Sequence, residues 1–138
     1  EINIMENKKT YKFDNGVLTV YSNYDVKYYC MYNNINLEDF NEPVTISDNV
    51  KSCEYMFQNC YSFNQHIIIP HGVWNCAHMF HNCFSFNQEI IIPDSVLDCS
   101  FMFYGCKSFD KEVRLSNNMK SNKRMFEGTA VNKHKNNL

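Results

Sequence analysis

The chain has 138 residues, of which 44% are hydrophobic and 20% are charged, and its formal net charge at pH 7 is −2. One domain of this length can bury a continuous core, and the charge balance gives no argument for binding nucleic acid or an anionic membrane surface. No stretch approaches the roughly 18 apolar residues of a membrane helix, so membrane insertion is not expected. Because the first residue is Glu1 and not Met, we expect a fragment or a processed product.

The first expected element is a β-hairpin from Lys9 to Tyr21. Asn15-Gly16 supplies the two left-handed positions of a type I′ turn, and pairing Asp14 with Val17 places the apolar residues of both strands on one face. We therefore predict an N-terminal hairpin and cap over residues 1–29, followed by a repeat region over residues 30–138.

The repeat region has a period of 23 residues, which is clearest in four Met-Phe pairs at Met56-Phe57, Met79-Phe80, Met102-Phe103 and Met125-Phe126. Such a period is typical of short coils that stack and bury their apolar edges against their neighbours. We predict about four coils with degenerate first and last copies. The recurring positions form the predicted structural core: Cys53, Met56, Phe57, Cys60, Phe63, Cys76, Met79, Phe80, Cys83, Phe86, Cys99, Met102, Phe103, Cys106 and Phe109.

Each coil contains a strand-like aliphatic triplet, such as residues 67–69 and 90–92. The outer two positions stay apolar in every copy, whereas the central position varies from Thr45 to Ile68, Ile91 and Arg114. Alternation therefore places the central side chain outside, on a ribbon of parallel strands. The predicted binding face of this ribbon consists of Thr45, His66, Ile68, Glu89, Ile91, Glu112 and Arg114.

The other half of each coil has apolar residues three or four apart, which predicts a short helical or 3-10 turn. The residue before the second cysteine is Asn59, Asn82, Gly105 or Gly128. Asn and Gly adopt left-handed backbone most easily, so this position is expected to end the turn. The predicted fold is an α/β repeat: a leucine-rich-repeat-type solenoid with short parallel strands on one face, short helical or 3-10 turns on the other, and an N-terminal hairpin cap.

The frame Phe-x-x-x-Ile-x-Ile-Pro-x-x-Val-x-x-Cys-x-x-Met-Phe-x-(Asn/Gly)-Cys, repeated over residues 40 to about 131, resembles the BspA-like leucine-rich repeat. Residues of the Met79 type stand where that family usually has Ala, residues of the Cys76 type stand where it has Ile, and one residue is shifted into the strand approach. The resemblance implies a non-catalytic adhesion or recognition protein of a bacterial surface, a protist or a phage virion.

The seven cysteines allow three interpretations: buried core thiols, an inter-coil disulfide, or a zinc site. Cysteines seven residues apart within a coil lie too far apart for a disulfide if the turn is helical. Cys76, His78, His81 and Cys83, with His66 and His71 nearby, contain zinc-ligand types. The histidine positions are occupied by other residue types in the neighbouring copies, which favours a variable outer surface.

No paired-carboxylate, phosphate-loop or triad pattern is present, so an enzyme and a cofactor are not expected. The preferred hypothesis is a recognition module that binds a protein or glycan through the ribbon, in a surface adhesin or a phage receptor-binding apparatus. The alternatives are a structural spacer or assembly subunit that associates through the ends of the stack, and a metal or redox protein.

Overall fold

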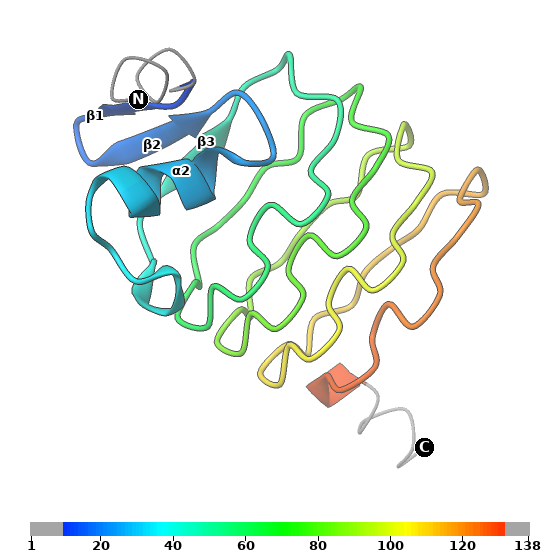
Figure 1. Cartoon of the computed structure of the whole chain (residues 1–138). Helices are drawn as coiled ribbons and strands as arrows, with labels where there is room; N and C mark the ends of the chain where they lie inside the picture. The colour runs from blue at the N-terminus through cyan, green and yellow to red at the C-terminus, as the bar shows by residue number, and fades with distance from the viewer. Residues whose placement is uncertain (1–9, 132–138) are drawn as a thin grey trace.

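The computed structural model describes residues 10–131 and places a small sheet and one helix at the N-terminal end of a row of loops (Figure 1). Lys9, the expected start of the hairpin, lies outside the described residues, as do residues 132–138 of the repeat region. A short 3-10 helix, η1 (Leu37–Asp39), precedes the last strand. Within the described part, no helix has the length and apolar character needed to cross a membrane.

The sheet has three strands in the order β1-β2-β3. Strands β1 (Lys12–Asp14) and β2 (Val17–Val20) are antiparallel, and Asp14 pairs with Val17 as the Asn-Gly turn predicts. Asn15 has φ 50° and Gly16 has φ 76°, the two left-handed positions of a type I′ turn. Strand β3 (Val44–Ile46) lies parallel to β2 on its other side, so the sheet is mixed.

Helix α2 (Asp25–Tyr32) begins at a buried carboxylate, and a left-handed asparagine, Asn34, follows two residues after its end. Asp25 is fully buried and accepts a hydrogen bond of 3.1 Å from the Ser22 amide, which suits a carboxylate at a helix N-terminus. Asn34 has φ 55°, and the Ile35 amide then donates to the Cys30 carbonyl at 2.9 Å. This Schellman ending turns the chain back toward the sheet. The predicted boundary between residues 29 and 30 falls within α2, and the division into two regions stays a prediction.

The rest of the described chain forms four layers, which we define as residues 47–69, 70–92, 93–115 and 116–131; they lie side by side in Figure 1. Neighbouring layers are joined by backbone hydrogen bonds from alternate residues of a tight turn region. We call the donors of this region the turn row, which in the second layer comprises Cys76, His78, Phe80 and Asn82. Isolated parallel bridges join equivalent residues next to these rows: Ser52, Asn75, Asp98 and Ser121.

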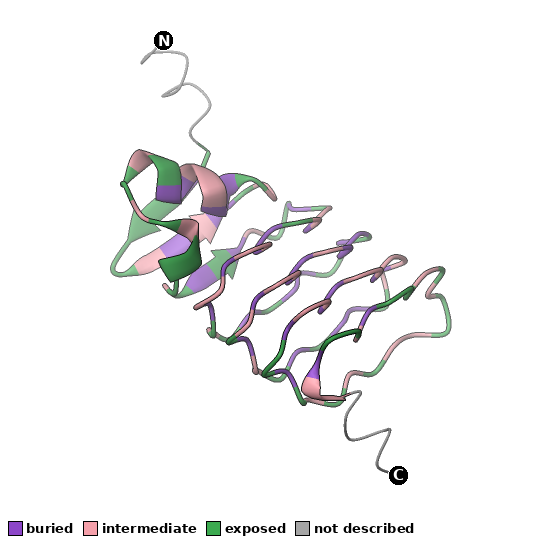
Figure 2. Cartoon of the chain, turned by 60° about the horizontal axis from the view of Figure 1, so that its bottom comes forward, coloured by how far each residue is buried: buried purple, intermediate pink, exposed green. Residues whose placement is uncertain are grey.

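The core lies between the turn rows and the aliphatic triplets, and buried residues recur in every layer along the row (Figure 2). All fifteen predicted core residues have 0% exposure. Phe57, Phe80 and Phe103 stack on one another with ring centroids 5.4 and 5.5 Å apart. A second column, from Phe63 to Phe86, has a spacing of 6.1 Å and packs against the first within each layer. Equivalent side chains therefore share equivalent environments.

The predicted leucine-rich-repeat-type α/β solenoid is wrong. Between residues 10 and 129 the regular elements are α2, η1 and a mixed three-stranded sheet, all at the N-terminal end, and a further helical segment begins at Ala130. The triplets at 67–69, 90–92 and 113–115 form no strands, and the opposite side of each layer has tight turns in place of helical segments. The sequence pattern predicted correctly which side chains are buried. It did not identify strands, because side chains of any extended chain alternate between buried and exposed, with or without a hydrogen-bonded ladder.

Candidate functional site

The outward side of the aliphatic triplets exposes two large apolar side chains. Ile68 is 73% exposed and Ile91 is 84% exposed, whereas the flanking Ile67 and Ile69 are 2% and 4% exposed. Exposure of isolated apolar residues is ordinary, but these two occupy equivalent positions in neighbouring layers. We call the surface formed by residues 66–69, 89–92 and 112–115 the open face.

The open face forms a shallow groove with a volume of about 900 Å³. Six of the seven predicted binding residues line it: His66, Ile68, Glu89, Ile91, Glu112 and Arg114. The seventh, Thr45, is exposed in β3 and does not line this groove. The sequence reasoning missed His71, Pro93 and Asp94, which border the groove because the chain turns there into the next layer.

The charged groups of the groove are mainly acidic. Glu89, Asp94 and Glu112 face it together with a single guanidinium, that of Arg114. No ion pair involves any of these four groups in the described part of the chain. An apolar centre with unpaired carboxylates at its rim is suited to a ligand that has apolar groups and positive charge.

The backbone of the open face is also unpaired. Among residues 10–131, no backbone hydrogen bond involves an N–H or C=O group of residues 66–69 or 89–92. In these two segments the packing of side chains such as Ile67 and Ile90 takes the place of a strand ladder.

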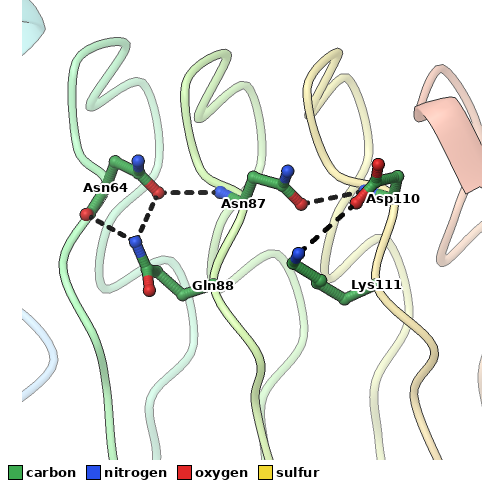
Figure 3. A network of polar contacts seen from close by, with 5 residues as sticks. All are labelled: Asn64, Asn87, Gln88, Asp110 and Lys111. Carbon is green, nitrogen blue, oxygen red and sulfur yellow. Dashed lines mark hydrogen bonds and ion pairs between the residues drawn. The ribbon is translucent and has the colours of Figure 1, made fainter.

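Just before the open face, a ladder of asparagine side chains aligns the layers (Figure 3). The Asn64 side-chain oxygen accepts from the Asn87 amide at 2.9 Å, and the Asn87 oxygen accepts from the Asp110 amide at 3.1 Å. Gln88 adds a side-chain donor to the Asn64 carbonyl at 3.1 Å. The side chains of Asn64 and Asn87 thus satisfy backbone N–H groups of the next layer. The ladder positions one edge of the open face.

The turn rows on the opposite side have a second left-handed position that the sequence did not reveal. Asn82 is left-handed as predicted, with φ 62°, but His78 also has φ 56°, as do Tyr55, Phe101 and Arg124 in the other layers with φ between 52° and 61°. The Tyr55, His78 and Phe101 rings stack at 4.6 and 4.7 Å. Bulky residues are uncommon in this conformation, so no residue-type signal was available.

The histidines and cysteines do not converge on one site. The Nδ1 atoms of His78 and His81 lie 2.9 Å apart, and partial burial lowers the pKa of both rings. Cys76 and Cys83 are instead fully buried. Within the described residues, no group of three or more His, Cys, Asp or Glu side chains is placed to hold a metal ion.

All seven cysteines are free and buried. Burial raises the pKa of Cys60, Cys99 and Cys106 to about 12, so these groups are neutral thiols near pH 7. The Cys83 thiol donates to the Phe57 carbonyl at 2.9 Å, and Cys106 repeats this contact with Phe80 one layer later. The cysteines thus serve as small core residues that link layers, and their low thiolate content opposes nucleophilic chemistry.

The chain belongs to the family described as "Mycoplasma protein of unknown function, DUF285", whose model matches residues 8–90 and again residues 28–137. The two matches overlap, as expected for a repeated sequence. No curated protein and no solved structure matches the chain.

Proposed function

We propose that this protein is a non-catalytic recognition module that binds a polypeptide partner through the open face. The observation that supports this function is the exposed pair Ile68 and Ile91, 73% and 84% accessible, in a groove on a molecule whose other repeated aliphatic residues are buried or half-buried. Burying two such side chains would contribute roughly 1.5–3 kcal/mol each to binding.

A protein suits this groove better than a glycan does. The centre of the groove is aliphatic, so the hydroxyl groups of a sugar would lose water there without gaining hydrogen bonds. A polypeptide can place an apolar side chain over Ile68 and Ile91 and a basic side chain near Glu89 or Glu112.

We further propose the finer assignment to BspA-like surface proteins and a location on a bacterial surface or a phage virion. The repeat frame of residues 40–131 supports this assignment, and the matching family is described for Mycoplasma, which agrees with a bacterial source.

The test is binding of the labelled chain to intact cultured epithelial cells and to a glycan array. We expect saturable binding that protease treatment of the cells abolishes, and loss of at least tenfold affinity in the Ile68→Asp/Ile91→Asp variant. The matched control is Tyr24→Asp/Met31→Asp, which removes two exposed apolar side chains, 57% and 53% accessible, at the α2 end. Equal binding by both variants, or glycan binding that neither variant affects, would contradict the proposal.

A structural spacer or assembly subunit is the second candidate. The backbone N–H groups of Asn122, Arg124 and Gly128 donate no hydrogen bond within residues 10–131, and this favours it, because such an edge can pair with another chain. Sedimentation equilibrium distinguishes the two candidates: a spacer that assembles with itself forms oligomers that keep the open face accessible, whereas an isolated recognition module is a monomer.

A further inference from the structure

The polar side chains at the rim of the groove differ in type between neighbouring repeats. His66 and Glu89 occupy equivalent positions, and so do His71 and Asp94 (89 − 66 = 94 − 71 = 23). All four side chains are exposed and line the groove. In the part of the chain that the structure describes, none of them forms an ion pair. One repeat therefore presents imidazole groups where the next presents carboxylates.

The two exposed isoleucines lie between these polar positions. Ile68 lies between His66 and His71 along the chain, and Ile91 lies between Glu89 and Asp94. The groove thus has an apolar centre that continues across two repeats, with hydrogen-bond donors beside its first isoleucine and acceptors beside its second.

A surface with this pattern is complementary to itself. Consider a second copy turned by 180° about an axis that lies in the plane of the open face, midway between Ile68 and Ile91 and parallel to the extended segments. Ile68 of each copy then meets Ile91 of the other. The same rotation sets His66 opposite Glu89 and His71 opposite Asp94, and two-fold symmetry makes each of these pairs occur twice.

Other two-fold arrangements bring like groups together. An axis through Ile91 sets Glu89 opposite Glu89 and Asp94 opposite Asp94. An axis that runs along the stack sets Glu89 opposite Asp94. Carboxylates that face each other oppose association, so the pattern of polar groups favours the axis midway between the isoleucines.

The remaining charged groups of the groove are compatible with this axis. Arg114 falls opposite Thr45 of the other copy, and Glu112 falls opposite Pro43, so neither meets a like charge. Both Thr45 and Pro43 are exposed.

We propose that the open face binds a second copy of this chain in a two-fold symmetric dimer, in which the isoleucines of the two copies pack together and the histidines donate hydrogen bonds to the opposing carboxylates. An imidazole ring carries at least one N–H group whether it is neutral or protonated, so it can donate in either state. This inference rests on the proposed function, because it names one polypeptide that the same surface binds.

The dimer is expected to be weak. The residues that line the groove are fewer than the roughly 20–30 on each side of a stable complex. The chain is therefore a monomer at the dilution of the cell-binding test and associates only at higher concentration. The dimer covers Ile68 and Ile91, which distinguishes it from the oligomers of a spacer.

The first test is sedimentation equilibrium of the full chain at concentrations up to roughly 1 mM, where we expect a monomer–dimer equilibrium with a dissociation constant on the order of 100 µM. The Ile68→Asp/Ile91→Asp variant should dimerise at least tenfold more weakly. The matched control, Tyr24→Asp/Met31→Asp, adds the same charge at the α2 end and should dimerise like the parent chain.

A pair of charge-swap variants tests which residues face each other. In a dimer of His66→Glu/His71→Glu, carboxylates oppose carboxylates, and in a dimer of Glu89→Lys/Asp94→Lys, lysines oppose histidines. Each variant alone should therefore stay monomeric. In an equimolar mixture, each introduced glutamate meets an introduced lysine and each native histidine meets a native carboxylate. The mixed dimer should be at least tenfold tighter than self-association of either variant.

The Glu89→Lys variant tests the orientation of the two copies. It should weaken the dimer, because residue 89 faces His66 in the proposed arrangement. It would strengthen the dimer if the axis ran along the stack, because residue 89 would then face Asp94.

Three outcomes would overturn the inference: no association up to roughly 1 mM, about tenfold above the expected dissociation constant, a dimer that the Ile68→Asp/Ile91→Asp variant leaves intact, and a dimer that Glu89→Lys strengthens. The cell-binding test separates this inference from the proposed function. Saturable cell binding by a chain that does not dimerise would contradict this inference alone. Dimerisation without any cell binding would contradict the proposed function and leave the second copy as the occupant of the open face.

Discussion

The two sides of each layer contact the neighbouring layers in different ways. On the turn side of the first three layers, backbone hydrogen bonds run to the next layer from every residue of a turn row, and the core Phe, Met and Cys side chains there are fully buried. On the open face, no backbone bond from another residue of the 10–131 segment involves residues 66–69 or 89–92, and Ile68 and Ile91 face solvent. The comparison teaches that the turn side holds the stack together, which leaves the open face free to vary its outward residues.

The largest expected effect is on the turn side, in the Phe80→Ala variant. Phe80 is fully buried and stacks on Phe57, Phe86 and Phe103, with the closest ring at 4.1 Å. We expect a loss of about 3–5 kcal/mol in the free energy of unfolding, because a cavity opens inside the core. Urea denaturation measures the loss. A loss below about 1 kcal/mol would mean that the stack collapses around the cavity.

The next largest effect on stability is expected at Asn82, whose backbone is left-handed. Both Asn82→Val and Asn82→Gly lose the side-chain contact to Asn59 at 3.2 Å, so a comparison of the two variants isolates the backbone term. At φ 62° a β-branched residue is strained, and we expect the Val variant to be about 1–3 kcal/mol less stable than the Gly variant. Thermal melts of the two proteins test this, and equal midpoints would contradict the turn assignment.

Two neighbouring residues of one aliphatic triplet, Ile67 and Ile68, test whether the buried and the exposed position differ in their contribution to stability. Ile67→Ser should destabilise the fold by about 2 kcal/mol or more, since it removes a buried apolar side chain that is 2% exposed. Ile68→Ser should change stability by less than about 0.5 kcal/mol, since that side chain is 73% exposed. Chemical denaturation of both variants is the measurement. Similar losses would show that the open face also contributes to the stability of the stack.

The smallest effect is a pH dependence of the turn side. Burial holds the pKa of His78 and His81 below the ordinary value of 6.5, so the unfolded chain takes up protons more readily than the folded one. The stabilisation is complete above pH 6.5 and decreases as pH falls through the lower, folded-state pKa values. Partial exposure screens the effect, and we expect less than about 1 kcal/mol.

The control for this pH dependence is the His78→Phe/His81→Gln variant, in which each ring is replaced by the residue type found in an adjacent layer, at Phe101 and Gln58. Its stability should fall less between pH 7 and pH 5 than that of the parent protein. Identical pH profiles would assign the effect to other groups.

The sequence predicted burial better than it predicted secondary structure. Comparing repeats identified the inward residues, because Phe57, Phe80 and Phe103 share one environment and must share one residue type. The same comparison predicted that Ile68 and Ile91 point outward. It could not distinguish a strand from an unpaired extended segment, because both give the same alternation of buried and exposed side chains. The leucine-rich-repeat solenoid was inferred from that ambiguous signal together with the 23-residue period and the resemblance to the BspA-like repeat.

The candidate site was predictable to a similar degree. Residues such as Ile68 and Glu89 were found because alternation fixes their direction. His71 and Asp94 were missed because they follow a turn whose course no pattern specifies. The left-handed conformation of His78 was also missed, because interlayer bonds impose it on residues that do not favour it.

The turn rows also determine how the chain can fold. Each of their bonds joins residues 22 apart, such as 53 to 75, 76 to 98 and 99 to 121, so every added layer closes a chain segment of the same length. The entropic cost of closure depends on segment length, and it is therefore the same for each layer. We expect the hairpin and α2 to form the folding nucleus, with growth proceeding from it layer by layer and the residues around Gly128 ordering last.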